Sequence, residues 1–128
     1  MRDVVIVSAM RTPIGDFLGS LKEKTAVQLG TAAFKAAISK AGIDPALIEE
    51  VAAGQVYQAG CQGNPSRQVT LNAGCPVETV SLTINQQCPS SMRSLEIISQ
   101  EIMLNKIDIG AVVGIESMTN VPYLLTKA

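Results

Sequence analysis

The 128-residue sequence contains no histidine and no tryptophan, and it has only two phenylalanines and two tyrosines. Histidine is the side chain that most often transfers protons near neutral pH, so a cysteine nucleophile in this chain would have no histidine partner within it. With so few aromatic side chains, the volume of the core must come from Val, Ile, Leu, Met and Ala. Such a core suits closely packed helices and strands.

Cysteine is also scarce: Cys61, Cys75 and Cys88 are an odd number, and no two of them have C-x-x-C spacing. Neither a disulfide framework nor a zinc site is therefore expected, and we predict no metal. Any function of a cysteine in this chain would be the function of a thiol.

The sequence lacks an excess of charge and a long apolar run. Ten Lys and Arg balance eleven Asp and Glu, and they are scattered, which argues against nucleic acid or an anionic membrane as partner. The N-terminal "MRDVVIVSAM" is too short and has too few basic residues for a signal peptide. We expect a soluble, cytoplasmic protein, with residues 1–128 forming one domain whose partners are small molecules and proteins.

Strands and helices are expected to alternate along the chain. Residues 3–10, a nearly continuous β-branched run, predict a central strand covered on both faces. A helix should follow between the cap Thr25 and the terminator Gly42, because apolar residues recur there at helical spacing. Residues 48–58 predict a second strand, interrupted at Gly54.

The second half continues the alternation. Asn64 as N-cap, Pro65 as first helical residue and Gly74 as terminator predict a short helix. Residues 78–85 alternate strictly between apolar and polar, so this strand is buried on one face or meets an interface.

A third helix is expected from Pro89 to about Leu104, with a small side near its start and the apolar stripe Met92, Leu95, Ile98 and Ile102. A further strand is expected over residues 106–115. Four strands separated by three helices favour the α/β class.

Cys88 in "INQQCPSSM" falls where the alternating strand meets the third helix. The N-terminus of a helix carries a partial positive charge, which stabilises a thiolate. A free cysteine is, however, often a small buried residue with no chemical role, so both interpretations stay open on pattern alone. Cys61 and Cys75 lack a comparable electrostatic setting.

Four motifs resemble those of one family in order and spacing: "VVIVSAMRTPIGDFLGSLK", "GQVYQAGCQGNPSRQVTLNAG", "TINQQCPSSM" and "GIESMTNVPYLL". The chain is similar to the N-terminal portion of the thiolases, in particular the acetoacetyl-CoA thiolases (acetyl-CoA acetyltransferases). This resemblance implies the layered αβαβα fold with a mixed, mostly parallel sheet. It also implies that Cys88 is the acyl-accepting cysteine, and that the strand Glu78 to Asn85 forms a homo-oligomer interface.

The same resemblance implies condensation of two acetyl-CoA to acetoacetyl-CoA and the reverse thiolysis, through an acyl-thioester on Cys88. The Cys88 backbone amide would contribute to an oxyanion hole. Coenzyme A thioesters would be substrates, and no cofactor would be bound permanently. A C-terminal thiolase half or partner subunit would supply the missing histidine, so this chain alone is expected to be incomplete.

Two departures from the family pattern accompany this interpretation, Pro89 and the absence of the loop domain and C-terminal half, and two alternatives stay open. Pro89 stands where relatives usually have a small residue, and its ring narrows the space beside the sulfur of Cys88. A different reaction in the same fold, such as longer-chain 3-ketoacyl-CoA thiolysis or a ketosynthase-like condensation on a carrier protein, stays open. A non-catalytic pseudoenzyme or assembly module is the other alternative, and Pro89 with the absent base favours it modestly.

Overall fold

The strand β1 (Glu50–Gly54) forms the centre of the sheet because its side chains are small and apolar on both faces. Val51, Ala52 and Ala53 are completely buried in the computed structural model, which describes residues 2–127. The strands β2 (Val80–Ile84) and β3 (Gly110–Gly114) pair with its two sides, both in parallel orientation. The sheet order is therefore β2-β1-β3.

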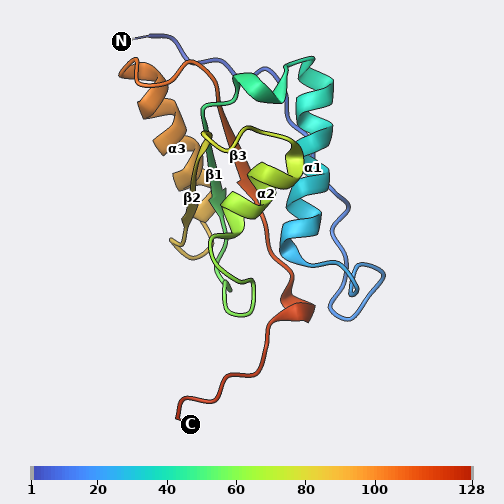
Figure 1. Ribbon diagram of the computed structural model, residues 1–128. Coiled ribbons are helices and arrows are strands. Elements are labelled where there is room, and N and C mark those ends of the chain that lie inside the picture. Colours follow the sequence, from blue (N-terminus) through green and yellow to red (C-terminus); the bar gives the residue numbers. More distant parts are fainter. Residues whose placement is uncertain (1, 128) are drawn as a thin grey trace.

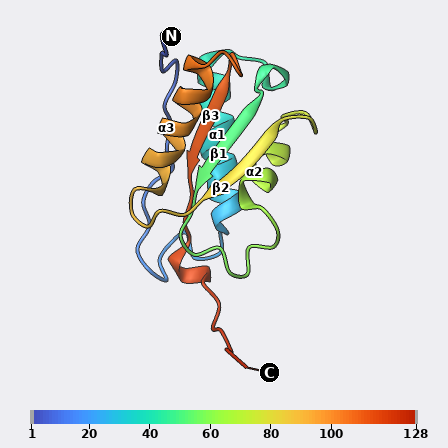
Figure 2. The same cartoon turned by 90° about the vertical axis from the view of Figure 1, so that its left-hand side faces the viewer.

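Helices cover both faces of this sheet (Figures 1 and 2). The α3 helix lies on one face, while α1 and α2 pack against each other on the other. Two short 3-10 helices, η1 and η2, complete the elements. The bounds are α1 Ala26–Ala41, η1 Pro45–Leu47, α2 Pro65–Ala73, α3 Ser90–Met103 and η2 Met118–Asn120. The predicted α/β class is confirmed.

The caps of α1 are those that the sequence predicts. The Thr25 hydroxyl accepts a hydrogen bond from the Gln28 amide, and the Gln28 side chain accepts one from the Thr25 amide. Gly42 ends the helix with a φ of 65°. Gly30 brings α1 close to the sheet, since a Cβ there would lie 2.3 Å from a side-chain carbon of Ile115.

The bounds of α2 are also confirmed. Asn64 caps the helix through a hydrogen bond from the Arg67 amide, Pro65 is its first residue, and Gly74 ends it with a φ of 97°.

The prediction for α3 is correct in extent and wrong in two details. Pro89 is the N-cap and not the first helical residue. The second detail concerns the faces of the helix. Ser90 and Ser94, on the side expected to lie opposite the apolar stripe, are almost inaccessible, whereas Met92 from that stripe is exposed. Small side chains are required there because the start of α3 approaches the backbone of β1 directly.

The predicted central strand over residues 3–10 is absent. These residues form no strand, and Val5, Ile6 and Val7 leave between 66% and 76% of their surface exposed. An apolar run becomes a buried strand only if another strand pairs with it, and nothing within residues 2–127 does so. The central position belongs to β1 instead.

The N-terminal segment is anchored at both ends and runs in the same direction as β3. Arg2 forms an ion pair with Asp108 before β3, and the Leu18 amide donates a hydrogen bond to Thr119 after it. An apolar groove of about 870 Å³ is bordered by residues 4–17, by α1 and α3, and by residues 109–119. The outer edge of β3 has no strand partner in the part of the chain that the structure describes.

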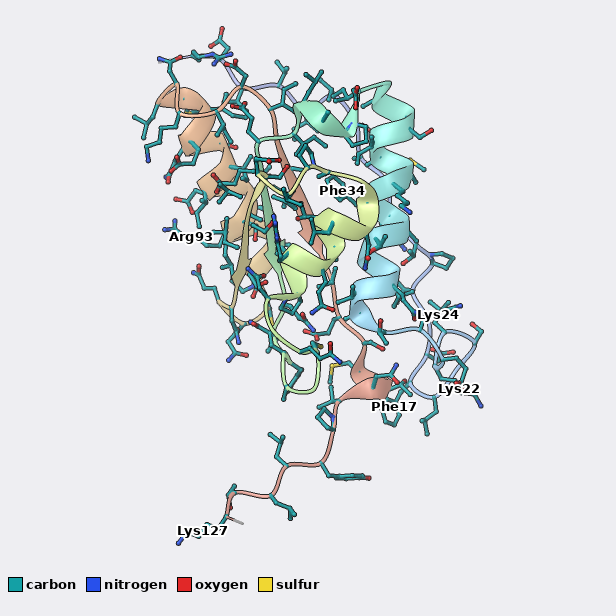
Figure 3. All side chains as sticks on the ribbon, viewed as in Figure 1. Phe17, Lys22, Lys24, Phe34, Arg93 and Lys127 are labelled. Carbon is teal, nitrogen blue, oxygen red and sulfur yellow. The ribbon has the colours of Figure 1, made fainter. Side chains whose placement is uncertain are left out.

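Beyond η2 the chain extends away from the body as far as Lys127 (Figure 3), and Tyr123, Leu124 and Leu125 are exposed.

Candidate functional site

The candidate site lies at the carboxyl edge of the sheet, the lower edge in Figure 1. Because the three strands are parallel, the segments that follow them emerge at this one edge. They are residues 55–64 after β1, residues 85–89 after β2 and residues 115–120 after β3. Ligands of open α/β sheets bind at the carboxyl ends of the strands, so this edge is where a binding or catalytic site is expected.

Cys88 lies on the turn that joins β2 to α3, and its side chain is exposed to solvent. Gln87, the residue before it, has a left-handed φ of 56°, which an L-residue with a long side chain rarely adopts. Backbone strain of this kind persists only where surrounding contacts fix it, and it is frequent at functional sites. The turn therefore presents the thiol outward at the start of a helix.

Hydrogen bonds from the side chains of Asn85 and Ser90 hold this turn. Asn85 accepts a hydrogen bond from the Gln87 amide at 3.0 Å and donates one to the Val56 carbonyl at 3.1 Å. The Ser90 hydroxyl accepts from the Gln86 amide at 2.9 Å. The turn is thus tied both to the end of β1 and to the first residue of α3.

The Cys88 backbone amide lies directly before Pro89, the N-cap of α3. No group within residues 2–127 accepts a hydrogen bond from this amide. A free N–H beside the thiol can donate to an oxygen on a bound molecule.

The segments after β1 and β3 are joined by Glu116. Its Oε2 accepts hydrogen bonds from the amides of Val56 and Tyr57, at 2.9 and 3.4 Å. Gln55 is 1% exposed, and its amide donates to the Tyr57 carbonyl and to the sulfur of Cys61. These two side chains keep the β1 segment in a fixed position beside the Cys88 turn.

The other two cysteines have different environments from that of Cys88. Cys75 is buried after α2, and burial raises the pKa of its thiol, which disfavours the reactive thiolate. Cys61 is half-buried in the segment after β1, where its sulfur accepts the hydrogen bond from Gln55. Only Cys88, among the three, is both exposed and next to the start of a helix.

Within residues 2–127, the structure contains neither a cluster of potential metal ligands nor a helix that could span a membrane. Between residues 2 and 127, no three His, Cys, Asp or Glu side chains gather closely enough to hold a metal ion. None of the helices over this range has the length and apolar character needed to cross a bilayer.

Sequence reasoning located Cys88 at the strand-to-helix joint, and the structure places it there. It did not identify Gln55, Ser90 or Glu116, which fix the surrounding backbone. Gln55 directly follows the apolar β1 strand, and Glu116 follows β3 by two residues. Polar residues at the carboxyl ends of buried strands often lie at a functional site, so this pattern could have identified both residues.

Comparison with known proteins gives a consistent result. The family profile "Thiolase, N-terminal domain" matches residues 4–128. Over 127 residues the chain is 47% identical to the mitochondrial acetyl-CoA acetyltransferase of Mus musculus, and 48% identical to acetyl-CoA acetyltransferase 1 of Arabidopsis thaliana. Both alignments cover 99% of this chain, but only 30% and 31% of the relatives.

Solved structures agree with the sequence matches. A thiolase from Ascaris suum, solved in complex with coenzyme A, superposes on 99% of this chain with a TM-score of 0.96 and 36% identity. An acetyl-CoA acetyltransferase from Syntrophomonas wolfei superposes on 97% with a TM-score of 0.91 and 41% identity. The chain spans 34% and 31% of these two structures, respectively. It belongs to the thiolase family and corresponds to that family's N-terminal domain.

Proposed function

We propose that this chain carries the acyl-accepting cysteine of an acetyl-CoA acetyltransferase, and that Cys88 is that residue. The observation that supports the proposal best is the exposed thiol on a strained strand-to-helix turn, in a chain of this family. The Cys88 thiolate attacks the thioester carbon of acetyl-CoA, a sulfur–carbon bond forms, and coenzyme A leaves as its thiolate. The product is an acetyl thioester on Cys88.

The second half of the reaction forms the new carbon–carbon bond. The enolate of a second acetyl-CoA attacks the acetyl carbonyl carbon, and the bond from that carbon to the Cys88 sulfur breaks. Acetoacetyl-CoA is released and the Cys88 thiolate is regenerated. In the thiolysis direction the same steps run backwards. Each step passes through a tetrahedral oxyanion, and we propose that the Cys88 amide donates a hydrogen bond to it; the lack of another acceptor for this amide within residues 2–127 supports the proposal.

Coenzyme A thioesters are the proposed substrates, and no permanently bound cofactor is needed for these steps. The Ascaris suum relative was solved with coenzyme A, and the relatives named above are acetyl-CoA acetyltransferases. We propose that the enzyme is cytoplasmic, like the cytosolic acetyl-CoA acetyltransferase of Gibberella zeae, although the relative from Mus musculus is mitochondrial.

A C-terminal thiolase half or partner subunit completes the proposed enzyme. The chain has no histidine to remove the thiol proton, and it spans about a third of its relatives. The apolar groove and the unpaired edge of β3 are the face we propose for this remainder, because both leave apolar surface exposed. A homo-oligomer is proposed to form through Glu78 to Asn85, since β2 lies at the opposite sheet edge.

The rate of alkylation by iodoacetamide tests the role of Cys88. The native chain is treated with the reagent, and peptide mass spectrometry follows Cys61, Cys75 and Cys88 separately. Cys88 should react well above the rates of the other two, while Cys75 should react slowest because it is buried. Equal, slow rates at all three positions would contradict the proposal.

A reconstitution experiment tests the activity itself. The chain is mixed with the C-terminal half of a related acetyl-CoA acetyltransferase, and coenzyme A-dependent cleavage of acetoacetyl-CoA is measured, with a Cys88→Ala chain as control. Activity that requires Cys88 supports the proposal. Cleavage of long-chain 3-ketoacyl-CoA in preference to acetoacetyl-CoA would favour the longer-chain thiolase. Stable assembly without turnover would favour the non-catalytic module, for which Pro89 beside the sulfur is the supporting observation.

A further inference from the structure

We propose that Ser90 is a positioning residue that fixes the turn carrying Cys88 and so sets the reactivity of its thiol. This inference rests on the proposed role of Cys88 as the nucleophile. Ser90 is 4% exposed and cannot itself touch a substrate, so any effect it has must act through the turn.

The hydroxyl of Ser90 bridges the strained part of the turn. It accepts a hydrogen bond from the Gln86 amide at 2.9 Å and donates one to the Gln87 carbonyl at 2.5 Å. The Ser90 amide also donates to the Gln87 carbonyl, at 3.1 Å. One buried residue thus binds the backbone on both sides of the left-handed Gln87, immediately before Cys88.

Pro89 explains why this bridge matters. It occupies the N-cap of α3, where a Ser, Thr, Asp or Asn side chain normally accepts a hydrogen bond from the first turn, and α3 has no such bond. Proline also lacks an N–H, so it contributes no donor that could hold the turn. The Ser90 hydroxyl, one position later, binds the backbone of Gln86 and Gln87 before the helix, so it holds the turn from the side of α3.

Ser90 in turn is fixed by the sheet. A Cβ at Gly54 of β1 would lie 2.7 Å from the carbonyl carbon of Ser90 and 2.5 Å from the Ser91 nitrogen. The first turn of α3 is therefore in direct contact with the β1 backbone. Through Ser90, the turn bearing Cys88 is held at a defined position relative to the centre of the sheet.

Ser94 supplies a matched control for Ser90. It is the same residue type on the same buried side of α3, one turn later, and it is completely buried. Its hydroxyl donates to the Ser90 carbonyl at 3.0 Å, within the helix, and makes no bond to the Cys88 turn. Ser90→Ala and Ser94→Ala both remove a buried hydroxyl from α3, but only Ser90→Ala releases the turn.

The test is the pH profile of Cys88 alkylation by iodoacetamide in the full chain, measured for the native protein, both variants and the urea-unfolded chain. The unfolded chain gives the reactivity of a Cys88 thiol without a fixed turn. In Ser90→Ala, the alkylation rate of Cys88 should differ from the native rate by about threefold, in the direction of the rate in the unfolded chain. The midpoint of the pH profile should also move towards the midpoint of the unfolded chain. Ser94→Ala should keep the native profile.

Two other outcomes would contradict the role proposed for Ser90. If the native and unfolded profiles differ but Ser90→Ala matches Ser94→Ala, Ser90 has no positioning role, and Cys88 stays the nucleophile. If the native profile equals the unfolded one, the fold of this chain does not set the reactivity of Cys88, and this inference fails. The proposed function is decided separately, by whether Cys88→Ala abolishes acetoacetyl-CoA cleavage in the reconstituted enzyme.

A second variant covers the case in which Ser90→Ala does not fold. Asn85→Ala removes the hydrogen bond to the Gln87 amide from an exposed side chain, so the core is left intact. It should move the Cys88 profile in the same direction as Ser90→Ala. An unchanged profile in a folded Asn85→Ala chain would show that Cys88 reactivity does not depend on a fixed turn.

Discussion

Two parts of this molecule are rich in apolar side chains but differ in how they bury them. In the body, residues 26–115 fill a common core between the sheet and the α1 and α2 helices. In the N-terminal segment, residues 3–18, most of the apolar side chains face solvent or the groove beside β3. Both parts have similar residue types, so the difference lies in their neighbours: every strand of the body has a partner, and the N-terminal segment has none.

This difference indicates which part of the fold is stable without another polypeptide segment. The body contains the paired strands and the buried core, so it should carry most of the stability of the chain by itself. The N-terminal segment has the composition of a buried strand and should contribute only when another polypeptide segment covers it.

The largest effect should come from the two phenylalanines, one in each part (Figure 3). Phe34 of α1 is 5% exposed and belongs to the core cluster, whereas Phe17 is 69% exposed. Phe34→Ala should lower the free energy of unfolding by about 3 kcal/mol, and Phe17→Ala by less than about 0.5 kcal/mol. Urea denaturation followed by circular dichroism measures both. Similar costs for the two variants would remove the distinction between the two parts.

A second effect concerns backbone contact within the body. Gly54→Ala places a Cβ against the backbone of Ser90 and Ser91, and should cost about 1–3 kcal/mol. Gly63 has no atom within 4 Å of the corresponding position, so Gly63→Ala should change the free energy of unfolding by less than about 0.5 kcal/mol. Thermal unfolding compares the two. A neutral Gly54→Ala would mean that α3 can move away from β1 without cost.

The third prediction sharpens the contrast at the N-terminal segment. Ile6 is 72% exposed, so Ile6→Ala should change the stability of this chain by less than about 0.5 kcal/mol. After addition of a C-terminal thiolase half, the same substitution should cost about 2 kcal/mol, because the covered side chain would then leave a cavity. Denaturation of the chain and of the complex gives both values. The same small cost in the complex would show that the remainder does not cover this segment.

The smallest effect should appear as a pH dependence within the body. Burial raises the pKa of the Cys75 thiol above its ordinary value of 9.0, so the folded state holds this proton more tightly than the unfolded state. The resulting stabilisation is complete below pH 9.0 and is lost as the pH rises through the folded value. Stability should therefore fall more steeply above pH 9.0 in the native chain than in Cys75→Ala. Parallel curves would indicate that Cys75 is not buried in solution.

Elements with local signals could be predicted from the sequence. Thr25 with Gln28 and Asn64 with Pro65 define helix starts by bonds within a few residues, and Gly42 and Gly74 end those helices by their left-handed φ. The position of Cys88 at a strand-to-helix joint followed from the same kind of signal.

Features that depend on distant partners could not be predicted in this way. Residues 3–10 have the pattern of a buried strand, but pairing requires a neighbour that the pattern does not specify. The left-handed Gln87 and the bridge made by Ser90 depend on how closely α3 approaches Gly54, which is a property of the packed sheet. A serine in a helix is expected to face solvent unless the close contact between α3 and β1 is known.

The parallel pairing of β1 with both neighbours also has a consequence for the rate of folding. Glu50 aligns with Val80 and with Gly110, so the chain must close loops of about 30 and about 60 residues before the sheet exists. The longer loop costs about 0.6 kcal/mol more in closure entropy than the shorter one. The β1-α2-β2 unit should therefore form in the transition state before β3 docks, and φ-values should be higher in β2 than in β3.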